Sequence, residues 1–162
     1  MRNRILIAVM PLLLAACSTT INTTQPLGTT FQNNLQVKDA DAKLGDGVTA
    51  PPDVATKLQQ AVMKDALTLD PGTTPVKLNM TITKYDLVSN VARFFTGAIL
   101  GSNKLDVDVD VVDEQDGKVI GHYSVDRDSN PGGYGAFYDQ EQATVDEAAK
   151  GVIAGLAGKK NS

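Results

Sequence analysis

The strongest constraint on the fold is a strict alternation of apolar and polar residues in two separate stretches. In residues 76–83 every second side chain is apolar, and the residues between them are Lys, Asn or Thr. In residues 105–111 every second residue is Leu or Val, and the residues between them are aspartates. Because successive side chains of a β-strand point to opposite faces, this period of two is typical of half-buried strands. The sequence therefore predicts a sheet with one buried and one polar face.

The second of these stretches continues into a predicted β-hairpin. Residues 114–117 read Glu-Gln-Asp-Gly, which fits a three-residue loop that places Glu114 opposite Lys118. Counting back from the turn aligns valine with apolar partners, whereas a slip of one residue would place valine against aspartate. The predicted pairs are Val109 with Tyr123 and Val107 with Val125 on the inner face, and Asp110 with His122 and Asp108 with Ser124 on the outer face.

Two further stretches have the spacing of amphipathic helices. Asp53 can cap a helix over residues 53–69, whose apolar residues recur on one face. A second helix, with an unbroken apolar stripe, ends near Gly158. It begins either near Asp139 or at a capping box formed by Thr144 and Glu147.

With a first strand at residues 31–38 and a polar connection over 39–52, the order of elements is β-α-β-β-β-α. We therefore predict an α+β two-layer sandwich, in which two helices cover one face of a four-stranded, mostly antiparallel sheet. The opposite face is expected to be polar and to carry Lys77, Asn79, Thr81, Thr83, Asp106, Asp108, Asp110 and His122.

The first 16 residues are predicted to be a secretory signal outside the folded domain. Arg2 and Arg4 precede the apolar run Ile5–Ala16, whose twelve residues are too few for a membrane span, which needs roughly 20. Cys17, the only cysteine of the chain, follows this run directly. No intrachain disulfide can therefore form, so the domain has to be held together by packing.

The residues Leu14-Ala15-Ala16-Cys17 resemble the lipobox of bacterial lipoproteins. That resemblance implies cleavage before Cys17, a diacylglycerol on its thiol and a further acyl chain on its amino group, palmitate among them. Three acyl chains are enough for stable anchoring. Ser18 after the cysteine implies an outer-membrane lipoprotein that faces the periplasm. The alternative is a cleaved signal with an incidental free thiol.

The remaining chain divides into a tether, one domain and a short tail. After Cys17, residues 18–30 are rich in threonine and are predicted to be a flexible tether that holds the domain roughly 20 Å from the membrane. Residues 31–158 are expected to form a single α+β domain, and residues 159–162 a frayed end. The net charge of −4 becomes more negative once Arg2 and Arg4 are removed, so nucleic acid is not an expected partner.

The layout as a whole resembles the YajG-like lipoproteins and related families of unknown function from the outer membranes of Gram-negative bacteria. The residues that carry the resemblance are Gly135-Ala136-Phe137 before the last helix and the strand over residues 105–113. It spans most of the mature chain. At the level of the fold, the layout is also similar to the periplasmic domains of curli-secretion lipoproteins and of lipoproteins that activate cell-wall synthases. Such a likeness is associational for function.

The polar residues give little reason to expect catalysis, a metal or a cofactor. Asp106, Asp108 and Asp110 would lie about 6–7 Å apart along one strand, too far for all three to hold one cation. We expect these aspartates to lie on a solvated face or to pair across strands with Lys77 or Lys84, and a weak calcium site is the alternative. A trio of Ser124, His122 and Asp110 on an open strand face would have neither an oxyanion hole nor exclusion of water. We therefore predict that the protein is not an enzyme.

Two segments are the candidate interaction surface. Residues 91–100 carry a single charge, Arg93. They could form a core strand or short helix, a partner-binding lip, or a membrane-touching or pore-lining insertion. Residues 132–137 are glycine-rich but lack the lysine of a phosphate loop. We predict binding of an envelope protein, or of further copies of the chain, through Phe94, Phe95, Ile99, Leu100, Tyr134, Phe137 and Tyr138.

Overall fold

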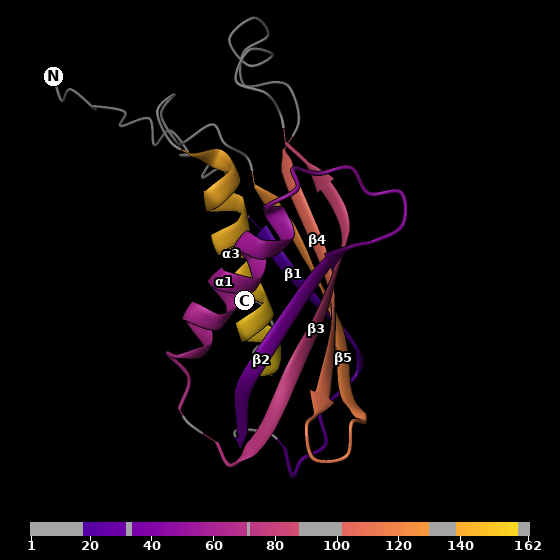
Figure 1. The fold of residues 1–162 in the computed structure, drawn as a ribbon, viewed down its shortest axis with the longest axis vertical. Helices are drawn as coiled ribbons and strands as arrows, with labels where there is room; N and C mark the ends of the chain where they lie inside the picture. Colours follow the sequence, from indigo (N-terminus) through magenta and orange to yellow (C-terminus); the bar gives the residue numbers. More distant parts are fainter. Residues whose placement is uncertain (1–17, 32–33, 71, 88–101, 130–138, 159–162) are drawn as a thin grey trace, which may run out of the picture.

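A computed structural model describes residues 18–31, 34–70, 72–87, 102–129 and 139–158, which form five strands and two helices. In chain order these are β1 (Ser18–Gln25), β2 (Leu35–Leu44), α1 (Val54–Ala66), β3 (Thr74–Asp86), β4 (Asn103–Asp113), β5 (Val119–Ser129) and α3 (Gln140–Leu156). The predicted α+β class with two helices is confirmed, whereas the sheet has one strand more than predicted (Figure 1).

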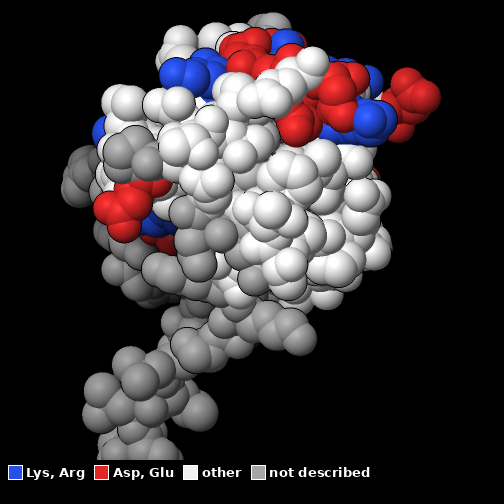
Figure 2. All heavy atoms as spheres, turned by 90° about the horizontal axis from the view of Figure 1, so that it is seen from below, with Lys and Arg blue, Asp and Glu red and all other residues white. Residues whose placement is uncertain are grey.

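The strands form one mixed sheet in the order β1-β5-β4-β3-β2. β2 and β3 run parallel because α1 connects them, and the other neighbours are antiparallel. Both helices lie on the same side of the sheet (Figure 1). Seen from below, charged side chains of both signs gather along one side of the molecule (Figure 2).

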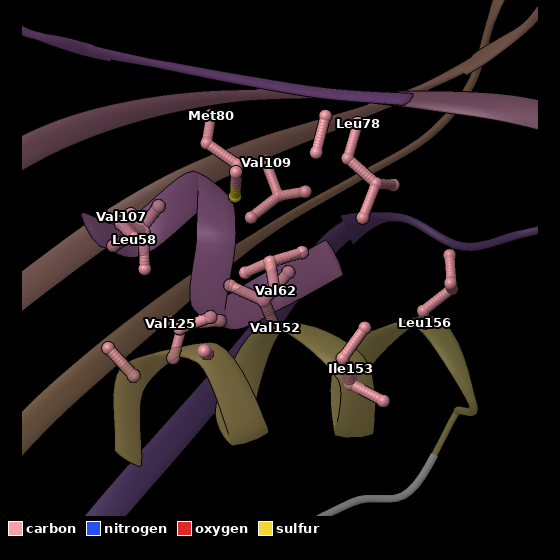
Figure 3. Close-up of a cluster of buried hydrophobic side chains, with 14 of the residues drawn as sticks. Leu58, Val62, Leu78, Met80, Val107, Val109, Val125, Val152, Ile153 and Leu156 are labelled. Carbon is pink, nitrogen blue, oxygen red and sulfur yellow. The ribbon is translucent and has the colours of Figure 1, made fainter. Parts of the chain in front are cut away.

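The core lies between the sheet and the two helices. The apolar residues predicted to point inward from residues 76–82 and 105–111 are buried, together with one stripe from each helix. Figure 3 shows side chains of both helices meeting those of the strands. The side chains labelled there are Leu58, Val62, Leu78, Met80, Val107, Val109, Val125, Val152, Ile153 and Leu156.

α3 packs closely on the sheet because two of its contact positions lack a Cβ atom. An added Cβ at Gly151 would lie 2.6 Å from Val125 Cγ1, and one at Gly155 would lie 2.4 Å from Tyr123 Cε2. The Tyr123 hydroxyl donates a hydrogen bond of 2.6 Å to the carbonyl oxygen of Val152. The ring of Tyr123 is therefore held between β5 and α3.

The prediction of a flexible tether over residues 18–30 is wrong for its first part, which forms the edge strand β1. β1 pairs with β5 from Ser18 opposite Asp128 onward. Its Thr and Ile residues favour extended backbone, and Ile21 packs against the core. The folded part therefore begins at least as early as Ser18.

Several boundaries within the predicted domain also differ. β2 begins at Leu35 rather than at residue 31, and α1 ends at Ala66 rather than near residue 69. β2 extends to Leu44 through the predicted polar connection, because Ala40, Ala42 and Leu44 alternate with charged residues. α3 begins at Gln140, and Asp139 caps it by accepting a hydrogen bond from the Gln142 backbone. The predicted capping box is wrong: Thr144 is buried in the helix, where its hydroxyl bonds to the Gln140 carbonyl oxygen.

The hairpin register is confirmed along most of β4 and β5. Val107 faces Val125, Val109 faces Tyr123, Asp108 faces Ser124 and Asp110 faces His122, as predicted. Close to the turn the register shifts by one residue, so the Asp113 backbone N–H bonds to the Lys118 carbonyl oxygen. The predicted pairing of Glu114 with Lys118 is therefore wrong.

Candidate functional site: one end of the sheet

All seven predicted interaction residues and Cys17 lie outside the described residues, but the residues that flank them are placed. Residues 88–101 follow β3 and precede β4, while residues 130–138 follow β5 and precede α3. Asp86 pairs with Lys104, Asn103 pairs with Ser129, and Ser18 pairs with Asp128. The register thus brings the described residues that flank both segments, together with Ser18, to one end of the sheet. We call it the loop end, and the end with residues 113–118 the hairpin end.

A three-residue ion cluster joins the two helices at the loop end. Lys57 Nζ of α1 lies 2.9 Å from Asp53 Oδ2 and 2.6 Å from Glu141 Oε1 of α3. The hydrogen bond to Glu141, and then that to Asp53, raise the pKa of Lys57. Both acidic residues lie at helix N-termini, where negative charge is favourable. This cluster fixes the first turns of α1 and α3 relative to one another.

Tyr85 is a buried polar group at the same end. Its hydroxyl oxygen is buried and has no hydrogen-bond partner among the residues that the structure describes. Burial, followed by the negative charge of Glu141, raises the pKa of Tyr85. The hydroxyl therefore stays protonated at neutral pH and remains a hydrogen-bond donor. The strict alternation of side chains ends at residue 83, so the sequence pattern did not connect Tyr85 with the helix N-termini.

Arg127 ties β1 to the rest of the loop end. Its side chain lies on the inner face of β5 with only 5% of the residue exposed. Its Nη1 donates a hydrogen bond of 2.8 Å to the Thr19 hydroxyl, and its Nη2 lies 3.8 Å from Glu147 Oε2 of α3. A buried charge is costly without such partners. Sequence reasoning missed this residue, although its period-two position after Tyr123 and Val125 pointed inward.

The outer sheet face carries polar residues as predicted, but the pairing differs in part. Lys77 lies 3.0 Å from Asp39 and 2.5 Å from Asp41, both on β2, rather than beside the aspartates of β4. His122 Nδ1 lies 2.6 Å from Asp110 Oδ1. Both of these side chains are partly exposed, at 34% and 45%. A pair so open to water gives a reacting group little shielding.

The described residues offer neither a metal-binding cluster nor a membrane-spanning helix. No group of three or more His, Cys, Asp or Glu side chains is placed there to hold a metal ion. No helix among those described is both long and apolar enough to cross a membrane.

Asp106 gives a pH-dependent prediction. It lies directly opposite Asp126, and burial, followed by the charge of Asp126, raises its pKa above the ordinary 3.8. The ionised form of Asp106 therefore lowers the free energy of unfolding above its raised pKa. This cost vanishes below pH 3.8, where the carboxyl group is protonated in both the folded and the unfolded protein. Asp106→Asn should raise the free energy of unfolding at pH 7 by a few tenths of a kcal/mol, roughly the scale of a cross-strand pair.

The measurement is urea unfolding at pH 7 and at pH 3.5. The gain from Asp106→Asn should shrink at the lower pH. Asp108→Asn is the matched control, because Asp108 faces Ser124 rather than an acidic residue. An equal gain from both variants at neutral pH would contradict the assignment to the Asp106–Asp126 pair.

A comparison with known protein families shows to which family the chain belongs. A family model described as "Domain of unknown function (DUF4410)" matches residues 28–133. The chain belongs to the DUF4410 family. The matched part of this DUF4410 protein contains β2 to β5 and the loop-end segment 88–101, whereas β1 and α3 lie outside it. Among curated proteins there is no significant match.

Solved structures share the fold of this DUF4410 protein at low sequence identity. A PelC dodecamer from Paraburkholderia phytofirmans aligns with a TM-score of 0.56 at 12% identity, over 88% of this chain and 100% of that one. A variant of that dodecamer, with one leucine replaced by methionine, gives 0.50 at 13% identity, over 86% and 98%. A candidate lipoprotein from Caulobacter crescentus gives 0.40 at 18% identity, over 80% and 92%. At these identities the PelC similarity shows the fold alone.

Proposed function

We propose that this DUF4410 protein is a lipid-anchored, non-enzymatic lipoprotein of the bacterial outer membrane whose periplasmic domain binds another envelope component. The observation that carries the proposal is the strand register at the loop end. Asp86 with Lys104, and Asn103 with Ser129, gather the flanks of both predicted interaction segments on three adjacent strands. The two segments that carry the seven predicted interaction residues therefore leave and re-enter the described structure at the same end of the domain.

The anchor in this proposal is Cys17. The lipobox resemblance supports lipidation. Ser18 lies in β1 at the loop end, so a lipid on the preceding residue would be attached to the domain there. The alternative proposal is a subunit of an oligomeric outer-membrane or secretion complex. It is favoured by the similarity of the fold to PelC, whose solved structures are dodecamers.

The test is photo-crosslinking in living cells from a photoreactive amino acid at Phe94 or Phe95, with mass spectrometry of the products. The control position is Gln115, which is exposed at the hairpin end. A discrete adduct with a different envelope protein, formed from Phe94 or Phe95 but not from Gln115, is the expected result. A ladder of self-adducts would favour the oligomeric alternative. Absence of adducts from both phenylalanines in folded, membrane-bound protein would overturn the proposed binding surface.

A further inference from the structure

The structure fixes where a lipid anchor at Cys17 would be attached to the domain. We propose that the loop end of the domain lies directly against the bilayer surface, with the hairpin end pointing into the periplasm. This inference rests on the proposed lipidation of Cys17. It goes further because it specifies which end of the domain meets the lipid. It also replaces the predicted flexible tether with direct attachment of the domain to the anchor.

The residues directly after Cys17 are held in the sheet, so no free chain separates an anchor at Cys17 from the domain. Ser18, the residue after Cys17, already pairs with Asp128 of β5. The next residues are held by side chains too, because Thr19 accepts a hydrogen bond from Arg127, and Asn22 donates one of 2.9 Å to Asp126. Adjacent Cα atoms are about 3.8 Å apart, so acyl chains on Cys17 would begin within a few ångströms of the sheet.

The second step is the direction of the strands. β1 runs from the loop end toward the hairpin end, antiparallel to β5. β5 has 11 residues, which at about 3.3 Å each place the hairpin roughly 35 Å from the loop end. A long tether would let any face approach the membrane, whereas direct attachment to a strand end restricts the approach to the loop end.

The third step concerns the charges that would face the headgroups. Described cations at this end are matched by acidic partners: Lys57 by Asp53 and Glu141, and Lys104 by Asp128 at 3.5 Å. Lys84 lies 3.8 Å from Asp86. These described residues form no unpaired basic patch of the kind that binds anionic lipid. The contact should therefore depend on the anchor and remain at high salt.

One consequence concerns the partner. Residues 88–101 and 130–138 join the described structure at the loop end, which would lie at the bilayer surface. A partner bound there would itself have to lie within or on the outer membrane. A component far out in the periplasm would meet the hairpin end first.

The experiment measures the distance of each end from the membrane. Lipidated protein is reconstituted into vesicles that carry a headgroup-level quencher, with one fluorophore on either Asp128→Cys or Gln115→Cys. The thioether at Cys17 leaves each variant a single free thiol. The Asp128 probe should be quenched several-fold more than the Gln115 probe, at low and at high salt. Equal quenching, or stronger quenching at Gln115, would overturn the proposed orientation.

Two further variants keep the test decisive. Asp86→Cys is a second probe for the loop end in case Asp128→Cys fails to fold, because Asp86 is exposed at the end of β3. A flexible insert between Cys17 and Ser18, starting with serine, should bring the loop-end quenching close to that of Gln115. Failure of the wild-type protein to float with vesicles would overturn the lipid anchoring itself. Flotation with equal quenching would overturn only the orientation.

Discussion

Replacing Leu58 by alanine should lower the free energy of unfolding by about 2–5 kcal/mol, the range for leucine truncation in a packed core. Leu58 is 0% exposed and extends from α1 into the layer between the helices and the sheet (Figure 3). The change removes buried methyl groups and leaves a cavity that neighbours on two helices and several strands can fill only in part. Urea unfolding in an unlipidated Cys17→Ser background measures the loss.

The matched control lies just beyond the same helix. Leu67 follows α1 as its C-cap residue and is 85% exposed. Leu67→Ala should change the free energy of unfolding by less than about 0.5 kcal/mol, as is usual for surface substitutions. If the two substitutions had similar effects, the placement of the helix stripe against the sheet would be wrong.

Adding one methyl group at Gly155 should destabilise the protein, although alanine is the better helix former. The helix preference for alanine favours the variant by at most about 1 kcal/mol. The new Cβ, however, would lie 2.4, 2.7 and 3.0 Å from three ring atoms of Tyr123. That ring is buried, and its hydroxyl is held by the Val152 carbonyl oxygen. Overpacking costs about 1–3 kcal/mol, and contacts this short belong to the upper part of that range. Gly155→Ala should therefore give a net loss of roughly 1–2 kcal/mol.

The control for this prediction is Gly28→Ala. A Cβ at Gly28 would meet Phe31 at 3.5 Å, which is ordinary van der Waals contact. The variant should be neutral or slightly stabilising, because alanine reduces the freedom of the unfolded chain. A gain in stability at Gly155 like that expected at Gly28 would contradict the close packing of α3 on Tyr123.

Where the alternation of side chains was strict, the sequence was enough to predict both the strand and its register. Val107, Val109 and Tyr123 point inward because the opposite assignment would bury aspartates. Near the turn the prediction failed by one residue. The structure has a register shift between Val111 and Val112. Both are valines, which are common in regular strands, so the sequence carries no signal of the shift.

β1 was missed because its inner face carries almost no hydrophobic signal. In Ser18–Gln25 only Ile21 is apolar, and the inward position at Thr19 is polar. Thr19 is tolerated there because the Arg127 guanidinium donates to its hydroxyl. That contact joins residues more than 100 positions apart, so local pattern reasoning could not find it. The same holds for Lys57 and Glu141, whose contact depends on how α1 and α3 pack.

The loop end illustrates the same limit for the candidate site. The apolar character of residues 91–101 and the aromatic residues of 134–138 were evident from the sequence. That their flanks meet on neighbouring strands, beside the residue that follows Cys17, required the strand order β1-β5-β4-β3. The predicted tether would have separated an anchor at Cys17 from the loop end, whereas β1 begins at the loop end itself.

Both the proposed function and the proposed orientation depend on a lipid anchor at Cys17. The most direct measurement is metabolic labelling with radioactive palmitate, comparing the wild-type protein with Cys17→Ala. Lipidation at Cys17 predicts label in the wild-type protein and none in Cys17→Ala, which should also leave the membrane fraction. Wild-type protein that is produced and exported without label, or label that persists in Cys17→Ala, would contradict it.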